Sequence, residues 1–170
     1  MNPLSVHFME LYRRHLRRHS EFGINVLHLA SVVGIYLSLL ALGLMLPYAS
    51  LIVGGLLVAY LLMLLPNLPV RTFAVTAAAI VALTLAASQL PAVSIWLYLL
   101  IILASHRLQI WQHRVYRREL DMSEFAGKYR KGPALAFMLA LYELPLLLHY
   151  LCFDRGVTLN ESTDEAMPVS

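Results

Sequence analysis

Histidine is the residue whose number and spacing in this chain point most directly to chemistry. His15 and His19 lie four residues apart near the N-terminus, and on a helix that spacing places both imidazoles on one face. Further along, His106 and His113 also share a helix face, and His28 lies one turn inside the first long apolar run. Neutral imidazole is a ligand for iron, zinc or copper. The sequence therefore predicts a metal site built from His15, His19, His28, His106 and His113.

The elements that must position these histidines are apolar helices. The chain has 170 residues, is 59% hydrophobic and only 14% charged, and has a mean hydropathy of +0.68. Soluble domains carry about 25% charged residues, so the excess apolar surface must face lipid. A helix of about 17–25 apolar residues spans a bilayer. We therefore predict four or five transmembrane helices, over residues 24–46, 50–65, 72–90, 92–113 and 133–153.

The predicted fold is an all-α, polytopic membrane bundle with a single domain over residues 1–153. An amphipathic helix is expected ahead of the first span, with His15 and His19 extending its apolar face. Four arginines of this helix are expected to point elsewhere: Arg13, Arg14, Arg17 and Arg18. The tail over residues 154–170 is polar and acidic, and we expect it to be disordered.

The distribution of positive charge predicts the orientation in the membrane. With the N-terminus in the cytoplasm, 12 of the 13 lysines and arginines fall on the inner side, and only Arg155 falls outside. This asymmetry predicts a multi-pass protein of the bacterial inner membrane or the endoplasmic reticulum. The sequence pI is near 9.2, but the basic residues lie at the ends of apolar runs, so we expect no nucleic-acid partner.

Glu143 is the one carboxylate in the middle of a predicted span, two residues before Pro145. A charge at this depth costs roughly 3 kcal/mol or more unless it is paired. We therefore expect a partner for it, either an inward-facing histidine or a bound cation. The alternative is a protonated, hydrogen-bonded glutamic acid that only joins helices.

Three stretches of the chain carry a family resemblance. They read LYRRHLRRHSEFGINVLHLASVVGIYLSL near the N-terminus, SHRLQIWQHRVY at the end of the fourth span and KGPALAFMLALYELP in the last span. In order and topology, over most of residues 8–150, the chain resembles the small membrane family of 2-hydroxy fatty acid dioxygenases, which are iron-dependent enzymes of fatty acid α-oxidation. It departs from that pattern in a shorter Asn25-to-His28 spacing and in Ser105 before His106. Either His106 or His113 can take the role of the family's later histidine.

The resemblance implies an Fe(II) ion held by histidines of the N-terminal segment, the first span and the fourth helix. It also implies a 2-hydroxy fatty acid that lies in the bilayer and reacts with dioxygen to give a chain one carbon shorter. Arg107, Arg114 or Arg117 would hold the substrate carboxylate, because a guanidinium matches it with two parallel hydrogen bonds. Arg107, Arg114 and Glu143 are the expected catalytic residues.

Two other classes of protein fit the same sequence. A haem-binding membrane protein can use His28 and His106 as axial ligands, because both lie at a similar depth. A non-enzymatic lipid-binding or scaffold protein would use every histidine at the membrane interface. We expect such a structural role for His7 and His149, which share no face with another histidine. Zinc proteases of the His-Glu-x-x-His type and glycine-rich phosphate loops are excluded, since neither motif is present.

Overall fold

The computed structural model describes residues 6–19, 21–91, 93–116, 123–129, 132–155, 157–159 and 166–168. Almost all of this part of the chain is helical, as predicted. The helices are α1 (Phe8–Leu16), α2 (Phe22–Leu44), α3 (Ala49–Leu64), α4 (Val70–Ser88), α5 (Ile95–Val115), α6 (Ser123–Ala126) and α7 (Pro133–Phe153). Within the tail that we expected to be disordered, the structure pairs two short antiparallel strands, β1 (Val157–Leu159) and β2 (Ala166–Pro168).

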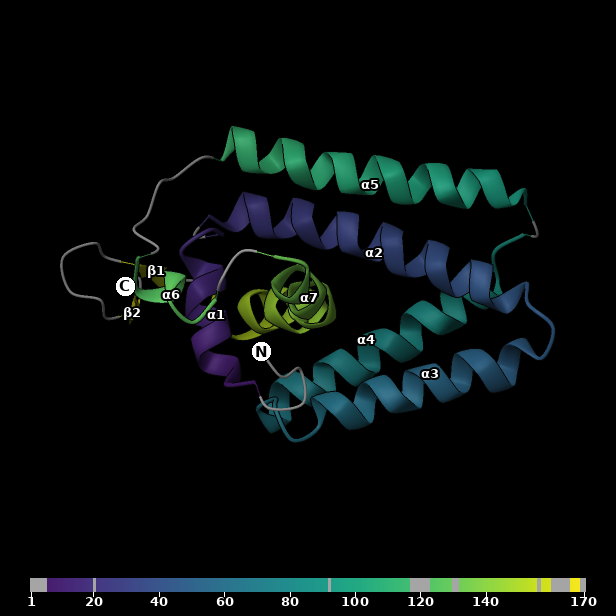
Figure 1. The fold of residues 1–170 in the computed structure, drawn as a ribbon, viewed down its shortest axis with the longest axis horizontal. Coiled ribbons are helices and arrows are strands. Elements are labelled where there is room, and N and C mark those ends of the chain that lie inside the picture. Colours follow the sequence, from purple (N-terminus) through teal and green to yellow (C-terminus); the bar gives the residue numbers. More distant parts are fainter. Residues whose placement is uncertain are drawn as a thin grey trace.

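Helices α2 to α5 run alongside one another and carry the long axis of the molecule (Figure 1). Helix α2 is the centre of the arrangement, because it packs against α3, α4, α5 and α7. The beginnings of α2 and α4 and the end of α5 lie at the same end of the molecule, which is also where α1 lies (Figure 1). The histidine-bearing parts of the chain, which are α1, the beginning of α2 and the end of α5, therefore lie at one end of the molecule.

Helix α7 crosses the other long helices instead of running beside them. Figure 1 views α7 nearly along its axis, while α2 to α5 lie across the view, with α2 and α5 on one side of α7 and α3 and α4 on the other. The last turn of α7 reaches the beginning of α4, where His149 Nδ1 lies 2.6 Å from Thr72 Oγ1. We predicted four or five spans, with residues 133–153 as the last, and the sequence did not indicate the direction of this helix.

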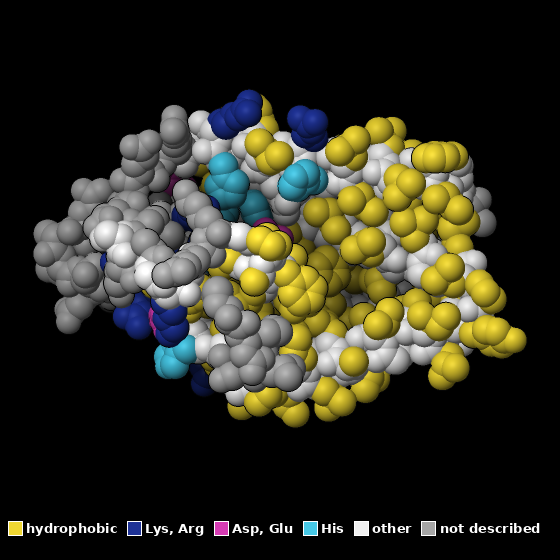
Figure 2. Space-filling view, in the orientation of Figure 1, with side chains coloured by type: hydrophobic (Ala, Val, Ile, Leu, Met, Phe, Trp, Pro, Cys, Tyr) yellow, Lys and Arg dark blue, Asp and Glu magenta, His cyan; other side chains and the backbone are white. Residues whose placement is uncertain are grey.

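The exterior of the molecule is that of a membrane protein. Among the described residues, α2, α4 and α7 are long and apolar enough to cross a membrane, and α3 is a shorter apolar helix. Large apolar side chains such as Leu51, Leu56 and Leu62 point outward. Hydrophobic side chains cover the half of the molecule away from α1, and the basic and histidine side chains gather toward the α1 end (Figure 2). Which end faces the cytoplasm stays a prediction.

Prolines set several of the helix ends. Helix α2 stops at Leu44, ahead of Pro47, and Tyr48 adopts a left-handed conformation (φ 59°) before α3 begins. Pro133 occupies the first turn of α7, where its missing N–H leaves no helical bond unmade. Each of the five predicted spans overlaps one helix, but α5 starts at Ile95 and not at residue 92.

The short helix α1 is held against the bundle by a buried apolar cluster. Phe8, Leu11 and Leu16 of α1 pack with residues of α7 such as Tyr142 and Leu146, and all five are at most 3% exposed. Burial of each such side chain contributes about 1.5–3 kcal/mol. This packing fixes the segment that follows α1, and with it the position of the first histidines.

Candidate metal centre

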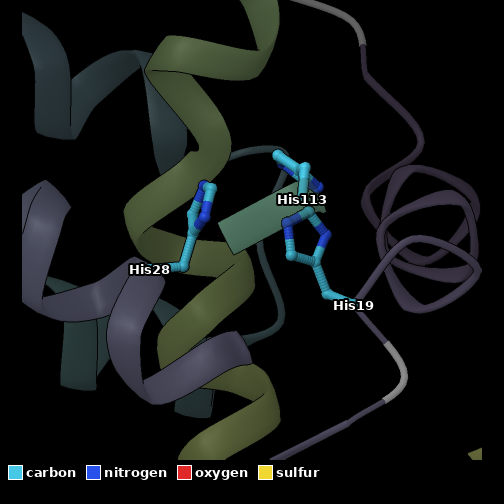
Figure 3. Close-up of side chains that lie close together, drawn as sticks. All are labelled: His19, His28 and His113. Atoms are coloured by element: carbon cyan, nitrogen blue, oxygen red, sulfur yellow. The ribbon is translucent and has the colours of Figure 1, made fainter. Parts of the chain in front are cut away.

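The turn after α1, the beginning of α2 and the end of α5 bring His19, His28 and His113 together. His19 lies just after α1, His28 lies in the second turn of α2, and His113 lies near the end of α5 (Figure 3). One ring nitrogen from each lies within 4.8 Å of the others. Nitrogens bound to one ion at about 2.0–2.1 Å lie within roughly 4.2 Å of one another, so small side-chain rotations would close the three rings on a metal. We call these residues the histidine trio.

His19 presents a free nitrogen to this centre. Its Nδ1 lies 3.2 Å from the carbonyl oxygen of His15, and because a carbonyl can only accept, Nδ1 carries the proton. The lone pair of the neutral ring is therefore on Nε2. That atom is buried and has no hydrogen-bond partner among the described residues. A buried polar atom without a partner is costly, and a metal ion would satisfy it.

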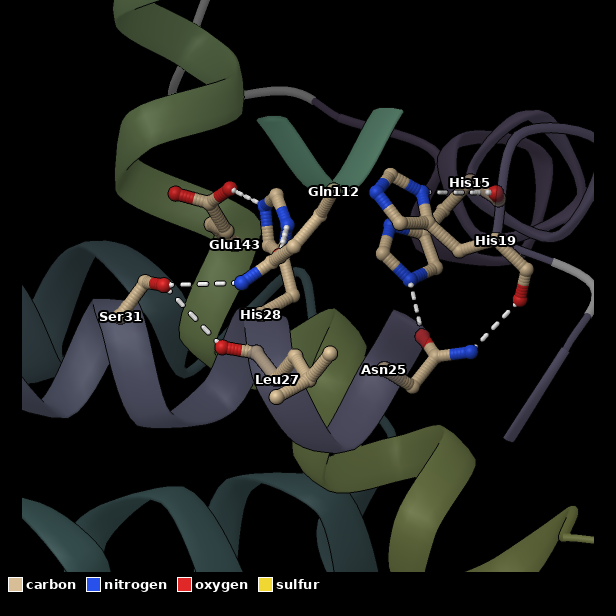
Figure 4. Close-up of polar contacts among 8 residues, drawn as sticks. All are labelled: His15, His19, Asn25, Leu27, His28, Ser31, Gln112 and Glu143. Carbon is tan, nitrogen blue, oxygen red and sulfur yellow. Dashed lines mark hydrogen bonds and ion pairs between the residues drawn. The ribbon is translucent and has the colours of Figure 1, made fainter. Parts of the chain in front are cut away.

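A chain of hydrogen bonds sets the tautomer of His28 (Figure 4). Ser31 Oγ donates its only hydrogen to the carbonyl of Leu27 (3.0 Å), so it must accept from Gln112 Nε2 (3.2 Å). The other end of the amide, Oε1, then faces His28 Nδ1 at 3.1 Å and accepts its proton. The lone pair of neutral His28 is consequently on Nε2. Outer partners of this kind orient and tune metal-binding histidines in general.

Gln112 is fully buried, and its exchange for leucine tests this role. We expect Gln112→Leu to lower metal affinity by about 10- to 100-fold, because His28 loses the acceptor that fixes its ring. Cobalt(II) titration of the purified variant measures the effect. Gln89→Leu is the matched control, since Gln89 is exposed at the end of α4. Equal metal affinity in Gln112→Leu and wild type would contradict the assignment.

Glu143 lies next to the metal-facing nitrogen of His28. Its Oε1 contacts His28 Nε2 directly, which supplies the partner that we expected for Glu143. Because Nε2 of the neutral ring carries a lone pair, this hydrogen bond needs a proton on Glu143 or a second proton on the ring. A metal ion bound to Nε2 would lie beside Glu143, so this carboxylate is the natural candidate for a fourth ligand. Glu143 reaches His28 because α7, which carries Glu143, packs across α2. Pro145 lies two residues further along α7.

His15 supports the centre from behind. Asn25 Nδ2 donates to two carbonyls, of His19 (2.6 Å) and Glu21 (2.9 Å), so its Oδ1 accepts from His15 Nε2 at 3.0 Å. The His15 ring stacks on His19 with centroids 4.1 Å apart and planes 10° apart. His15 thus lies outside the trio, although we expected it to be a ligand. Its role here is to hold the His19 ring and, through Asn25, the turn into α2.

Burial favours the neutral ring of both His15 and His19. Burial lowers the pKa of His15 to about 3. Burial, reinforced by the neighbouring imidazoles, holds the pKa of His19 well below its ordinary value. Both shifts favour neutral rings near pH 7, so His19 need not lose a proton before its lone pair is available to a metal.

His106 does not belong to the trio, because it lies about two turns away from His113 along α5. Residues seven apart on α5 rise about 10.5 Å along the axis, so one ion cannot easily bind both His106 and His113. The structure brings His113 to the trio, whereas His106 lies two turns earlier on α5, where it is exposed and lines both cavities described below. Of the five predicted ligands, His19, His28 and His113 come together.

The arginines near the centre are not those we expected. Arg107 and Arg114 are exposed and line neither of the two cavities described below, and Arg117 lies outside the described residues. Arg14 and Arg18 of the N-terminal segment line the cavity of the trio instead. The expectation that these two point away from the histidines is wrong. Arg18 follows Leu16, where α1 ends, and Arg14 lies within α1 but is buried against the bundle.

Two adjacent cavities share part of their walls near the trio. The first has a volume of about 230 Å³ and contains the trio. The second is an apolar groove of about 540 Å³ between α2, α3 and α7. The residues that line both are His106, Gln109 and Glu143. In Figure 2 a hollow lined by hydrophobic side chains is bordered by histidine and acidic side chains at one end.

His149 has the structural role we expected. Its Nδ1 meets Thr72 Oγ1 at 2.6 Å, and its Nε2 lies 3.5 Å from Asp154. The ring packs edge-on against Tyr12 with centroids 4.5 Å apart. His149 therefore ties the end of α7 to α1 and α4.

The fold and the centre together define a class of protein: a helical membrane protein with a three-histidine cluster able to hold a metal ion. Comparison of the chain with family models, curated proteins and solved structures gives no match. The resemblance to the 2-hydroxy fatty acid dioxygenases therefore rests on the motifs alone and stays a prediction.

Proposed function

We propose that this protein is a membrane-embedded, non-haem Fe(II) dioxygenase that shortens a 2-hydroxy fatty acid by one carbon. The observation that carries the proposal is the junction of the histidine trio with an apolar groove at Glu143. A metal-binding centre and a channel for an acyl chain are the two parts that such a reaction needs. The family resemblance supplies the particular substrate and the metal.

The donor set suits iron. Imidazoles combined with a carboxylate, with positions left open, are typical of non-haem Fe(II) oxygenases. His19, His28 and His113 would hold the ion, with Glu143 beside it. When bound, the ion supplies the site at which dioxygen is activated. The protein's own residues orient the ligands, through Gln112 and Asn25, and enclose the substrate head.

The groove suits a single acyl chain that enters from the bilayer. Its volume lies within the roughly 300–1,000 Å³ typical of sites for small molecules. Its walls include Leu39, Ile52 and Leu56, which are also exposed on the exterior of the molecule. A lipid in the membrane can therefore reach the groove sideways. The polar end of the groove, at His106 and Glu143, would face the head of the molecule and borders the cavity of the trio.

The proposed reaction balances with one molecule of dioxygen. The bond between C1 and C2 of the substrate breaks, C2 becomes the carboxyl carbon of the shorter acid, and C1 leaves as carbon dioxide. The hydroxy acid is the reductant, and the remaining oxygen atom leaves as water.

Incubation with 2-hydroxyhexadecanoate and air tests the proposal. We expect iron-loaded protein in phosphatidylcholine nanodiscs to form the 15-carbon acid, detected by mass spectrometry, because the centre and the groove hold metal and substrate together. His113→Ala should lose this product, while His7→Ala, which changes an exposed histidine ahead of α1, should retain it. Protein that binds iron and yields no shortened acid would contradict the proposed reaction.

The haem alternative has less support from the centre. Haem proteins use one or two axial side chains, whereas three imidazoles converge here. Of the two axial candidates, His28 belongs to the trio and His106 does not. A Soret band in the purified protein would favour haem and contradict the non-haem proposal.

A further inference from the structure

Arg14 is a buried cation without a counter-ion among the residues that the structure describes. Its side chain is 5% exposed, and its Nε has no hydrogen-bond partner. The contact found for its guanidinium is with the ring of Tyr129, 5.7 Å from Cζ. No carboxylate of the described residues forms an ion pair with it. A buried charge is costly unless it is paired, so this side chain is arranged to receive an anion.

Arg18 adds a second positive charge at the same place. It lies one turn after Arg14 along the chain, is exposed, and lines the same cavity as the histidine trio. Burial and the neighbouring Arg18 both lower the pKa of Arg14. Among the described residues that line this cavity, the acidic one is Glu143, which contacts His28. The part of the cavity formed by the N-terminal segment is therefore positively charged.

We propose that Arg14 and Arg18 form the binding site for the carboxylate of the acyl substrate. A guanidinium pairs with a carboxylate through two parallel hydrogen bonds, and burial strengthens them. The acyl chain would occupy the apolar groove, and the head would pass His106 and Glu143 to reach the arginines. C2 is one bond from the carboxylate carbon, so fixing the carboxylate also fixes the reacting carbon beside the trio. This inference rests on the proposed function for the nature of the substrate.

Binding of ligands that share a chain and differ in the head tests the site. Metal-free protein in neutral detergent, kept in EDTA, is titrated with tetradecanoate, tetradecanol and tetradecyl phosphate, which displace fluorescent cis-parinaric acid. We expect Arg14→Met to weaken tetradecanoate binding by about 10- to 100-fold and to leave tetradecanol unchanged. Methionine keeps an apolar stem against Tyr129. Arg13→Met is the matched control on the same helix, since Arg13 is exposed and lines neither cavity.

Arg18→Met keeps the test decisive if Arg14→Met does not fold, because Arg18 is exposed. We expect it to weaken tetradecanoate binding several-fold. Equal losses for tetradecanoate and tetradecanol in either variant would overturn the proposal, since they would show a structural effect. Tighter binding of tetradecyl phosphate than of tetradecanoate by the wild type would overturn the assignment to a carboxylate.

Cobalt(II) titration of the same samples separates this inference from the proposed function. Both arginine variants should bind cobalt like the wild type, because neither residue belongs to the trio. Metal binding without a preference for tetradecanoate over tetradecanol would remove the carboxylate site alone. A preference for tetradecanoate that depends on Arg14, in protein that binds no metal, would remove the metal centre alone.

Discussion

Replacement of His28 by alanine is expected to lower metal affinity by more than about 100-fold. Loss of even an outer partner of a ligand typically costs 10- to 100-fold, and His28 is itself proposed to bind the ion. The substitution also removes the partner of Gln112 and of Glu143, which both contact the ring. Metal retained after dialysis, measured by mass spectrometry of the element, gives the result.

A variant of a second metal-binding histidine distinguishes loss of the metal site from loss of the fold. His113 is exposed, so His113→Ala should change stability little and still lose the metal. His7→Ala is the control for general effects of removing an imidazole. Metal content equal to wild type in both His28→Ala and His113→Ala would contradict the histidine trio as the binding site.

Replacement of Gly34 by leucine is expected to separate α2 from α5 and to lower the free energy of unfolding by about 1–3 kcal/mol. A Cβ atom at Gly34 would lie 2.7 Å from Ser105 Oγ, so a whole leucine side chain has no space. Metal affinity should fall with stability, because α2 carries His28 and α5 carries Gln112 and His113. Thermal unfolding in detergent and cobalt titration measure the two effects.

Gly54 provides the matched control for that substitution. Nothing lies within 4 Å of a Cβ atom built on Gly54, which also lies in an apolar helix. Gly54→Leu should therefore be neutral or slightly stabilising, since leucine favours a helix more than glycine does. Similar destabilisation by both leucine variants would show that the α2–α5 contact is not what Gly34 preserves.

The helices and the general location of the centre could be predicted from the sequence. Long uncharged runs between prolines determine helices, and the overlap of each predicted span with one helix follows from that. Most of the histidines lie near the ends of apolar runs in the sequence, and the charge asymmetry predicts that these ends share one side of the membrane. Such patterns describe each helix relative to its own axis.

Which histidines come together depends on where each helix ends and how far along its helix each residue lies. The spacing of histidines in the sequence does not give this information. The spacing of His15 and His19 suggests one shared helix face, but α1 ends at Leu16 and only His19 turns its free nitrogen to the centre. His106 and His113 share a face, yet the rise along α5 allows only one of them to reach the trio. To predict the ligands, one must know where α1 ends and how far along its helix each histidine lies.

The residues that contact the ligands could not be predicted from the sequence, because they come from distant parts of the chain. Gln112 and His28 are 84 residues apart, and Glu143 and His28 are 115 residues apart. Their contacts depend on how α5 is rotated against α2 and on the crossing direction of α7. Apolar composition makes α7 a helix that is long enough to span, but it does not determine that direction.

X-ray absorption by the wild-type protein, reconstituted with Fe(II) under reducing conditions, tests the central claim most directly. The trio predicts one iron per chain with three imidazole nitrogens at about 2.0–2.2 Å. Iron that is absent, substoichiometric or surrounded by water oxygens alone would contradict a metal centre formed by His19, His28 and His113.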